Sequence, residues 1–219
     1  MFVCNPLLNS LDLSRLKTVI FDCDGVLFDS RDVNIRFYNR IKDYFGLDPM
    51  SREEEEYVHM HSVRDSLEYI LPQQYHSRLP EVREHIKYSE MLPYMRMEDG
   101  VSHLLELLLQ KRVRMAINTN RSTTMNLLLQ RFGLQDYFWP VITAGHVSRP
   151  KPHPESLHKI MELCGLHPEE TVFIGDSVVD QETALGAGVS FWGYKNEYLK
   201  GDMFIPDFWT LREFLARKL

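Results

Sequence analysis

Cysteine is scarce in this chain, and its three copies are widely spaced. They stand at positions 4, 23 and 164, and no two of them form a Cys-x-x-Cys pair. An odd number at such distances argues against a disulfide framework and against a zinc site built on paired thiolates. The nine histidines do not supply a His-Glu-x-x-His motif or another zinc spacing. This usage favours a protein of the reducing cytoplasm, so we expect a cytoplasmic location.

Long apolar runs and basic stretches are also missing. The longest apolar run, at residues 104–109, is interrupted by Glu106 and is far too short to cross a bilayer. The N-terminal segment has no early Lys or Arg and no clear small-residue cleavage site, so we expect no secretory signal. The formal net charge is -6, and no basic segment is interleaved with aromatics. We therefore expect neither a membrane nor a nucleic acid as a partner.

The composition is that of a folded protein. With 219 residues, 44% hydrophobic and 26% charged, the chain can bury the core of one large domain with a smaller insert. From residue 99 onward, apolar runs alternate with helix-period segments, which predicts βαβ units and a parallel sheet. We expect strands near residues 113–117, 141–144, 171–174 and 189–192, and helices near 101–111, 122–132, 154–164 and 207–215.

Residues 29–98 differ in character from this pattern. Strand-like runs vanish there, and charged segments with a helical period take over. Ile35, Tyr38 and Ile41 share one helix face, and Ser51 precedes four glutamates as a helix N-cap does. A further helix is expected near 80–91, so the segment predicts an all-helical insert.

The predicted fold class is α/β, a Rossmann-like three-layer core with a parallel sheet plus an inserted α-helical cap domain. The core domain takes residues 1–28 and 99–219, and the cap domain takes residues 29–98. A short helix is expected over residues 11–16, before the first strand at about 17–22. Because the insert leaves from the end of that strand, it is placed to cover this end as a lid.

The first predicted strand runs directly into two carboxylates. Residues 19–21 are apolar and predict a short buried strand, and Asp22, Asp24 and Gly25 follow it. In open α/β sheets, ligands bind at the carboxyl ends of the strands. Two carboxylates so close together repel, so a magnesium ion or a shared proton is expected to neutralise them.

Polar residues also follow the other predicted strands. They are Thr119 and Asn120, then Lys151, and then Asp176, Ser177 and Asp180. Because parallel strands put these loops at one edge of the sheet, we expect the side chains to meet there. Singly, each has a plain structural explanation as a turn residue, a helix cap or a loop lysine. Four such loops in chain order indicate a site.

These segments resemble, in order and spacing, the four motifs of the haloacid dehalogenase superfamily of aspartyl-nucleophile hydrolases. They stand here as Asp22-Cys-Asp-Gly-Val-Leu27, Met115-Ala-Ile-Asn-Thr-Asn120, Lys151-Pro-His-Pro154 and Gly175-Asp-Ser-Val-Val-Asp180. The similarity covers the chain from about residue 17 to its end. The helical insert between the first two motifs resembles the cap of the phosphoglycolate phosphatase and β-phosphoglucomutase-like group.

The resemblance implies a magnesium-dependent phosphomonoester hydrolase that acts through an aspartyl-phosphate intermediate on a small phosphorylated metabolite. Asp22 would be the nucleophile. Asp24 would be the general acid and later the base, which requires a raised pKa or a well-placed proton donor. The Thr119 hydroxyl and the Asn120 backbone N–H, at a helix N-terminus, would bind the phosphoryl oxygens, and Lys151 would neutralise charge.

The same resemblance implies a Mg²⁺ site. Its ligands would be the carboxylates of Asp22 and Asp176 and the backbone carbonyl of Asp24. Asp180 would orient Lys151 or a metal-bound water. The supporting residues around the site are therefore Gly25, Ser177 and Asp180.

Cap residues bear on the alternatives. The 2-haloacid dehalogenases lack the second acid, so Asp24 favours phosphoryl transfer. Residues 63–67 resemble the cap segment whose arginine meets the substrate in β-phosphoglucomutases, which makes Arg64 a candidate substrate contact; a surface ion pair is the alternative. Those mutases carry a cap histidine where Asn34 stands here, which favours a phosphatase.

A sugar-phosphate mutase and a non-catalytic protein that binds phosphorylated ligands therefore stay as alternatives. Either a monomer or a homodimer is compatible with the sequence. His59 and His61, two residues apart in the insert, are interpreted as surface or lid residues, and Cys23 as a core residue.

Overall fold

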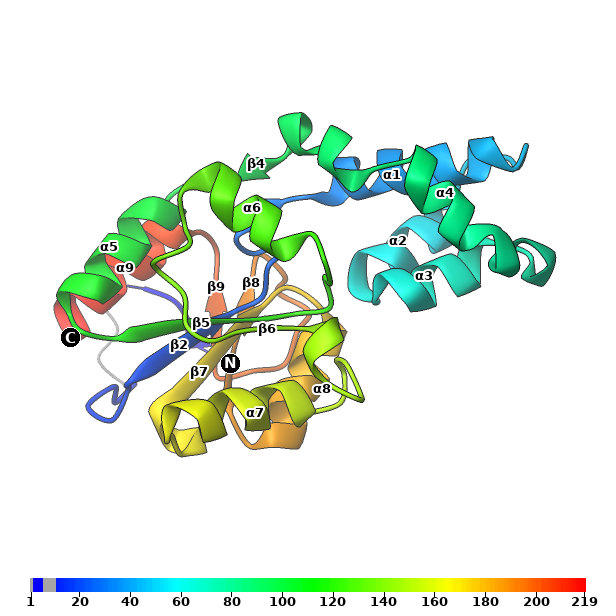
Figure 1. Cartoon of the computed structure of the whole chain (residues 1–219). Helices are drawn as coiled ribbons and strands as arrows, with labels where there is room; N and C mark the ends of the chain where they lie inside the picture. Colours follow the sequence, from blue (N-terminus) through cyan, green and yellow to red (C-terminus); the bar gives the residue numbers. More distant parts are fainter. Residues whose placement is uncertain (1, 6–10) are drawn as a thin grey trace.

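Seven strands form one sheet in the computed structural model, which describes residues 2–5 and 11–219 (Figure 1). Their order across the sheet is β1-β9-β8-β7-β2-β5-β6, and each neighbouring pair is parallel. The strands are β1 (Phe2–Val3), β2 (Thr18–Phe21), β5 (Arg114–Thr119), β6 (Val141–Thr143), β7 (Thr171–Gly175), β8 (Ser190–Tyr194) and β9 (Met203–Ile205). The predicted parallel sheet is confirmed, and β2 lies between β7 and β5.

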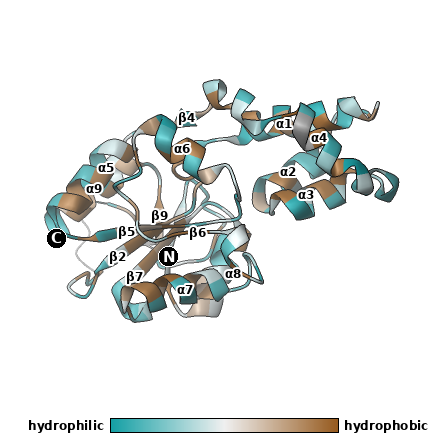
Figure 2. Ribbon diagram, in the orientation of Figure 1, coloured by the Kyte–Doolittle hydropathy of each residue, from teal (hydrophilic) through white to brown (hydrophobic). Residues whose placement is uncertain are grey.

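Helices cover both faces of the sheet. In Figure 1, α5 and α9 lie on one side of it, and α7 and α8 lie on the other. The bounds are α5 (Val101–Gln110), α6 (Met125–Phe132), α7 (Glu155–Cys164), α8 (Val178–Ala187) and α9 (Phe208–Lys218). Figure 2 shows largely hydrophobic strands and helices of mixed colour, as expected when each helix buries only one face.

The central strand supplies side chains to both hydrophobic layers. Val19 and Phe21 pack in the layer that contains residues of α5, α6 and α9, whereas Ile20 packs in the layer of α7 and α8. All three side chains are fully buried. Successive strand residues point to opposite faces, so an unbroken apolar run fits a parallel strand covered on both sides.

The helices between the first two motifs form a separate group beside the sheet (Figure 1). They are α1 (Arg31–Tyr44), α2 (Arg52–Met60), α3 (Val63–Ile70) and α4 (Leu79–His85), with 3₁₀ turns at Gln73–Arg78, Tyr88–Glu90 and Leu92–Tyr94. The N-cap expected at Ser51 is confirmed, because its hydroxyl accepts a hydrogen bond from the Glu54 amide.

The chain enters and leaves this helical group through a two-stranded ribbon. β3 (Phe28–Asp29) is antiparallel to β4 (Arg96–Met97). The domain limits expected at 28/29 and 98/99 lie in this ribbon and just beyond it. The division into a core domain and a cap domain stays a prediction.

Some expected elements differ from the structure. The helix expected over residues 11–16 is wrong, because these residues form only a turn closed by the Leu16 amide and the Leu13 carbonyl. The helix expected over 80–91 ends at His85, where Ile86 becomes extended. Strands β1 and β9, of two and three residues, were too short to detect from apolar runs.

The described residues bear on two expectations, one about disulfides and one about membrane-spanning helices. The cysteines at 4, 23 and 164 are all free. No helix in residues 2–5 and 11–219 is long and apolar enough to cross a membrane.

Helix α5 offers a matched pair of leucines for testing the core. Leu104 is fully buried and Leu109 is 60% exposed on the same helix. We expect Leu104→Ala to lower the free energy of unfolding by about 2–5 kcal/mol, because it leaves a cavity under the sheet. Leu109→Ala should change it by less than about 0.5 kcal/mol. Urea unfolding followed by circular dichroism measures both, and equal effects would contradict the assigned core.

Candidate active site

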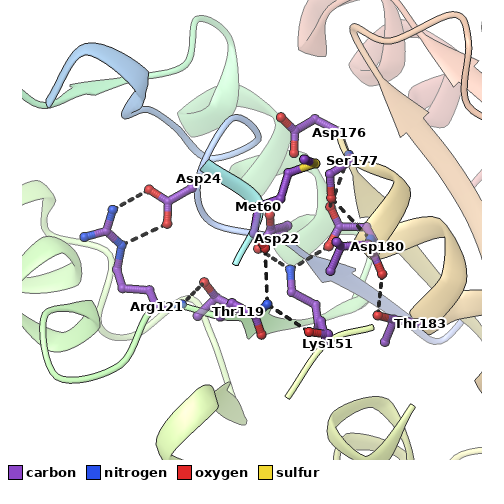
Figure 3. A network of polar contacts seen from close by, with 12 residues as sticks. Asp22, Asp24, Met60, Thr119, Arg121, Lys151, Asp176, Ser177, Asp180 and Thr183 are labelled. Atoms are coloured by element: carbon purple, nitrogen blue, oxygen red, sulfur yellow. Dashed lines mark hydrogen bonds and ion pairs between the residues drawn. The ribbon is translucent and has the colours of Figure 1, made fainter. Parts of the chain in front are cut away.

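Three of the motif loops follow neighbouring strands and meet at one edge of the sheet. Phe21, the last residue of β2, pairs with Ile117 of β5 on one side and with Ile174 of β7 on the other. This register places the residues that follow these strands next to one another (Figure 3). Lys151, from the loop before α7, extends into the same place. The structure thus brings together Asp22, Lys151, Asp176 and Asp180, as the sequence predicted.

Lys151 links two of the carboxylates. Its Nζ donates hydrogen bonds to Asp22 Oδ1 at 2.8 Å and to Asp180 Oδ1 at 2.5 Å. All three side chains are buried. Burial alone would lower the pKa of Lys151, but Asp180 and Asp22 outweigh it and raise this pKa, so the ammonium stays charged.

Asp22 remains costly to ionise in spite of this lysine. Burial raises the pKa of its carboxyl, and the nearby Asp180 raises it further, while Lys151 opposes the rise. Burial likewise raises the pKa of Asp176. One lysine among three carboxylates leaves an excess of negative charge that a bound cation or phosphoryl-binding donors would relieve.

Asp180 is both a helix cap and a member of this charge cluster. Its amide donates to Ser177 Oγ, and its Oδ2 accepts hydrogen bonds from the Ser177 hydroxyl and amide at the start of α8. A Cβ on Gly175 would lie 2.4 Å from Asp180 Cβ, so only glycine leaves room for this arrangement. From the sequence, a capping box of Ser177 with Asp180 and a role in the site are alternatives for these residues. In the structure Asp180 takes part in both.

An acidic cluster with the chemistry of a metal site lies beside Lys151. Carboxylate oxygens of Asp22, Asp176 and Asp180 all lie within 4.8 Å of one another. Gly25, at φ +79°, permits this approach, because a Cβ there would lie 2.1 Å from Asp176 Oδ2. Hard oxygen donors with excess negative charge fit a hard divalent cation, so these residues could hold a metal ion.

Asp24 is bound in a way that the sequence did not predict. Both of its carboxylate oxygens accept hydrogen bonds from the Arg121 guanidinium, which is buried. Burial alone would raise the pKa of Asp24, but Arg121 outweighs it and lowers this pKa to about 2. Of the two conditions named for an acid role, a raised pKa is not met in this conformation, in which Asp24 is an ion-paired carboxylate.

Arg121 also connects the core to the helical insert. Its Nη2 donates to the Tyr88 hydroxyl at 2.9 Å, and its Nη1 donates to Thr124 Oγ1 at 3.0 Å. The Tyr88 hydroxyl donates in turn to Asn34 Oδ1 at 2.7 Å. The sequence motifs predict no catalytic or binding role for Arg121. Its position directly after the second motif was the only available signal.

Thr119 is the last residue of β5 and Asn120 follows it, but no helix begins there. Thr119 Oγ1 accepts a hydrogen bond from the Arg121 amide at 3.0 Å, and α6 begins only at Met125. The expectation that Asn120 stands at a helix N-terminus is therefore wrong, because a turn separates it from the helix. Its side-chain amide donates instead to the backbone carbonyls of Lys151 and Met60, at 3.1 and 3.3 Å.

A cavity of about 440 Å³ opens above these residues, and both the core and the insert line it. Asp22, Asp24, Lys151 and Asp176 lie in its wall, with apolar side chains from the insert. His59 lines it as well, with Nε2 3.6 Å from Asp176 Oδ2. From the sequence, His59 is interpreted as a surface or lid residue, because no spacing pattern links it to Asp176.

Two further sequence interpretations concern single residues. Arg64 lies on α3 with its side chain 79% exposed, near Asp65 and Glu68, and it does not line the cavity in this conformation. Cys23 is fully buried, as expected, and burial raises the pKa of its thiol. The structure thus assembles every core-motif residue but leaves Arg64 outside.

The buried Asp24–Arg121 pair generates a stability prediction. We expect Arg121→Gln to lower the free energy of unfolding by about 3 kcal/mol, because it leaves a buried carboxylate without its partner. Adding Asp24→Asn should recover part of the loss. Arg64→Gln, at an exposed arginine, should cost less than about 1 kcal/mol. Chemical denaturation of the wild type and the three variants measures these values, and an Arg121→Gln variant as stable as Arg64→Gln would contradict the pairing.

Comparison with known proteins agrees with this geometry. Residues 19–194 match the haloacid dehalogenase-like hydrolase family. A phosphoglycolate phosphatase from Aquifex aeolicus is 26% identical over 200 residues, 88% of this chain and 91% of the relative. A pyrophosphatase PpaX from Oceanobacillus iheyensis is 28% identical over the same shares.

A solved structure is similar over nearly the whole chain. It is a HAD-superfamily hydrolase of subfamily IA, variant 1, from Geobacter sulfurreducens. The match has a TM-score of 0.77 and 38% identity, and it covers 92% of this chain and 98% of that one. The sequence motifs, the sheet topology and these similarities lead to one assignment: the chain belongs to the haloacid dehalogenase-like hydrolase family.

Proposed function

We propose that the protein is a Mg²⁺-dependent phosphomonoester hydrolase that acts on a small phosphorylated metabolite through an aspartyl-phosphate at Asp22. The observation that carries the proposal is the buried Asp22 carboxylate, with Lys151 Nζ 2.8 Å from its Oδ1, in the wall of a cavity. A carboxylate held beside a fixed positive charge can attack phosphorus and form an acyl phosphate.

The reaction then proceeds in two displacements. In the first, an Asp22 carboxylate oxygen bonds to phosphorus while the bond from phosphorus to the ester oxygen breaks, and a proton from Asp24 neutralises the leaving alkoxide. In the second, Asp24 takes a proton from water, and that water attacks the phosphorus of the acyl phosphate. Phosphate leaves, and Asp22 is restored as a carboxylate.

Asp24 must change its contacts to play this part. In the present conformation both of its oxygens are bound by Arg121, and the Asn34 amide lies 3.4 Å from Oδ1. Proton transfer therefore requires that Asp24 leave Arg121. The remaining ligands of the phosphoryl group are proposed to be the Thr119 hydroxyl and the Asn120 backbone N–H.

The metal ion would be held by Asp22, Asp176 and the backbone carbonyl of Asp24. When bound, Mg²⁺ supplies charge neutralisation between the carboxylates and the phosphoryl group. Gly25, Ser177 and Asp180 support this site through the close approach at Gly25 and the hydrogen bonds of the α8 cap.

The cavity volume of about 440 Å³ suits a small molecule, which supports a small metabolite as the substrate. Contact between Arg64 and the substrate stays a prediction that requires the insert to move. A monomer or homodimer and a cytoplasmic location also stay predictions.

A mutase is the second candidate, because a cap side chain does reach Asp24. That side chain is Asn34, and its amide cannot exchange a proton as a histidine can. We therefore favour hydrolysis over transfer to a second hydroxyl.

The nucleophile assignment is tested by Asp22→Asn. We expect turnover of an aryl phosphate to fall by at least about a thousandfold, because an amide cannot form the acyl phosphate. Wild-type activity should also disappear when EDTA removes divalent ions. Asp48→Asn, at an exposed aspartate of the insert, is the matched control and should keep full activity. Retained turnover in Asp22→Asn would refute the assignment, and inactive wild type with every divalent metal would support the non-catalytic alternative.

The two catalytic candidates differ in their products. With a sugar 1-phosphate and a bisphosphate activator, the protein is expected to release inorganic phosphate and not to form the isomeric sugar phosphate. Phosphorus NMR distinguishes these products. Accumulation of the isomer without free phosphate would identify a mutase.

A further inference from the structure

His59 connects the helical insert directly to a carboxylate of the acidic cluster. It stands in the last turn of α2, and its side chain is only 15% exposed. Its Nε2 lies 3.6 Å from Asp176 Oδ2. The next residue, Met60, accepts a hydrogen bond at its backbone carbonyl from the Asn120 side chain. The end of α2 is therefore docked on two core loops, those that follow β5 and β7.

The Asp176 carboxylate makes its close side-chain contact with the insert and not with Lys151. Lys151 forms its two ion pairs with Asp22 and Asp180. Within residues 2–5 and 11–219, His59 is the one side chain in ion-pair contact with the Asp176 carboxylate. The loop itself is fixed separately, because Asn196 Nδ2 donates to the Asp176 backbone carbonyl at 3.0 Å. His59 thus acts on the carboxylate without being needed to hold the loop.

The position of His59 does not make it a member of the metal-ligand cluster. The carboxylate oxygens of Asp22, Asp176 and Asp180 lie within 4.8 Å of one another, and the cluster does not include a nitrogen of His59. The ring approaches Asp176 from the insert. A ring N–H and a metal ion both require the electron-rich oxygens of this carboxylate.

We propose that His59 is a positioning residue that competes with the metal ion for Asp176, so that metal binding and docking of the insert on the core oppose each other. The inference rests on the Mg²⁺ site of the proposed function. Without the ion, Asp176 holds the end of α2 through His59. With the ion bound, this contact weakens, and the end of α2 is held mainly by the Met60–Asn120 hydrogen bond.

Such coupling is reciprocal. If the ion weakens the His59 contact, then loss of His59 must strengthen binding of the ion by the same factor. A role of His59 in packing alone would not produce this reciprocity.

The test uses the full chain and measures Mg²⁺ affinity by isothermal titration calorimetry, without substrate. We expect His59→Phe to bind Mg²⁺ about fivefold or more tightly than wild type, the lower range of typical coupling. His61→Phe is the matched control, because its ring also lines the cavity but stacks on Tyr57 and contacts the Tyr57 carbonyl. It should bind Mg²⁺ as wild type does. His59→Gln, which keeps an N–H donor, should fall between them and replaces His59→Phe if that variant does not fold.

Hydrogen exchange provides a second readout. Addition of Mg²⁺ should speed amide exchange over residues 52–70 in wild type and in His61→Phe. In His59→Phe this segment should already exchange fast without the ion and respond little to it.

The outcomes separate this inference from the proposed function. Equal or weaker Mg²⁺ binding by His59→Phe and His59→Gln would overturn the competition, even where Mg²⁺-stimulated hydrolysis is intact. Absence of Mg²⁺ binding by wild type would overturn the competition as well. The proposed function would be refuted too only if the wild type also failed to hydrolyse phosphomonoesters.

Discussion

The ion pairs of Lys151 with Asp22 and Asp180 are the interaction on which the site depends. Three carboxylates at the edge of the sheet would repel one another in a buried place, and one lysine lies between two of them. The loops around it are built to allow this approach. Gly25 and Gly175 lack the Cβ atoms that would collide with Asp176 and Asp180. The strand order then fixes which loops can take part, because β2 lies between β5 and β7.

Lys151 does not neutralise all three carboxylates, and the negative charge that remains determines what the site can bind. Lys151 forms its ion pairs with Asp22 and Asp180 and not with Asp176, and burial raises the pKa of both Asp22 and Asp176. A buried excess of negative charge is unfavourable unless a cation or a hydrogen-bond donor relieves it. The three carboxylates could therefore hold a divalent ion.

The helical insert takes part in this balance through residues at the cavity. Tyr88 binds Arg121, which holds Asp24, and His59 faces Asp176. Asp24 and Asp176, the two acids that the proposed reaction needs beside Asp22, are therefore in contact with groups whose position depends on the insert. Movement of the insert would alter proton transfer and metal binding together, which is a physical basis for a lid that does more than exclude water.

The sequence by itself determined the layers and the core of the site. Apolar runs of buried strands, the helical periods and four polar strand ends predicted the parallel sheet and the meeting of Asp22, Lys151, Asp176 and Asp180, because these features are encoded within a few neighbouring residues. Only the tertiary structure decided the partners of Asp24 and Asp176. Arg121 lies 97 positions from Asp24 in the chain, and His59 belongs to a helix with no spacing pattern of a site. The Asp24–Arg121 contact arises because β2 and β5 are neighbours in the sheet, and the Asp176–His59 contact arises from how the insert packs on the core. No local pattern of residues records either arrangement.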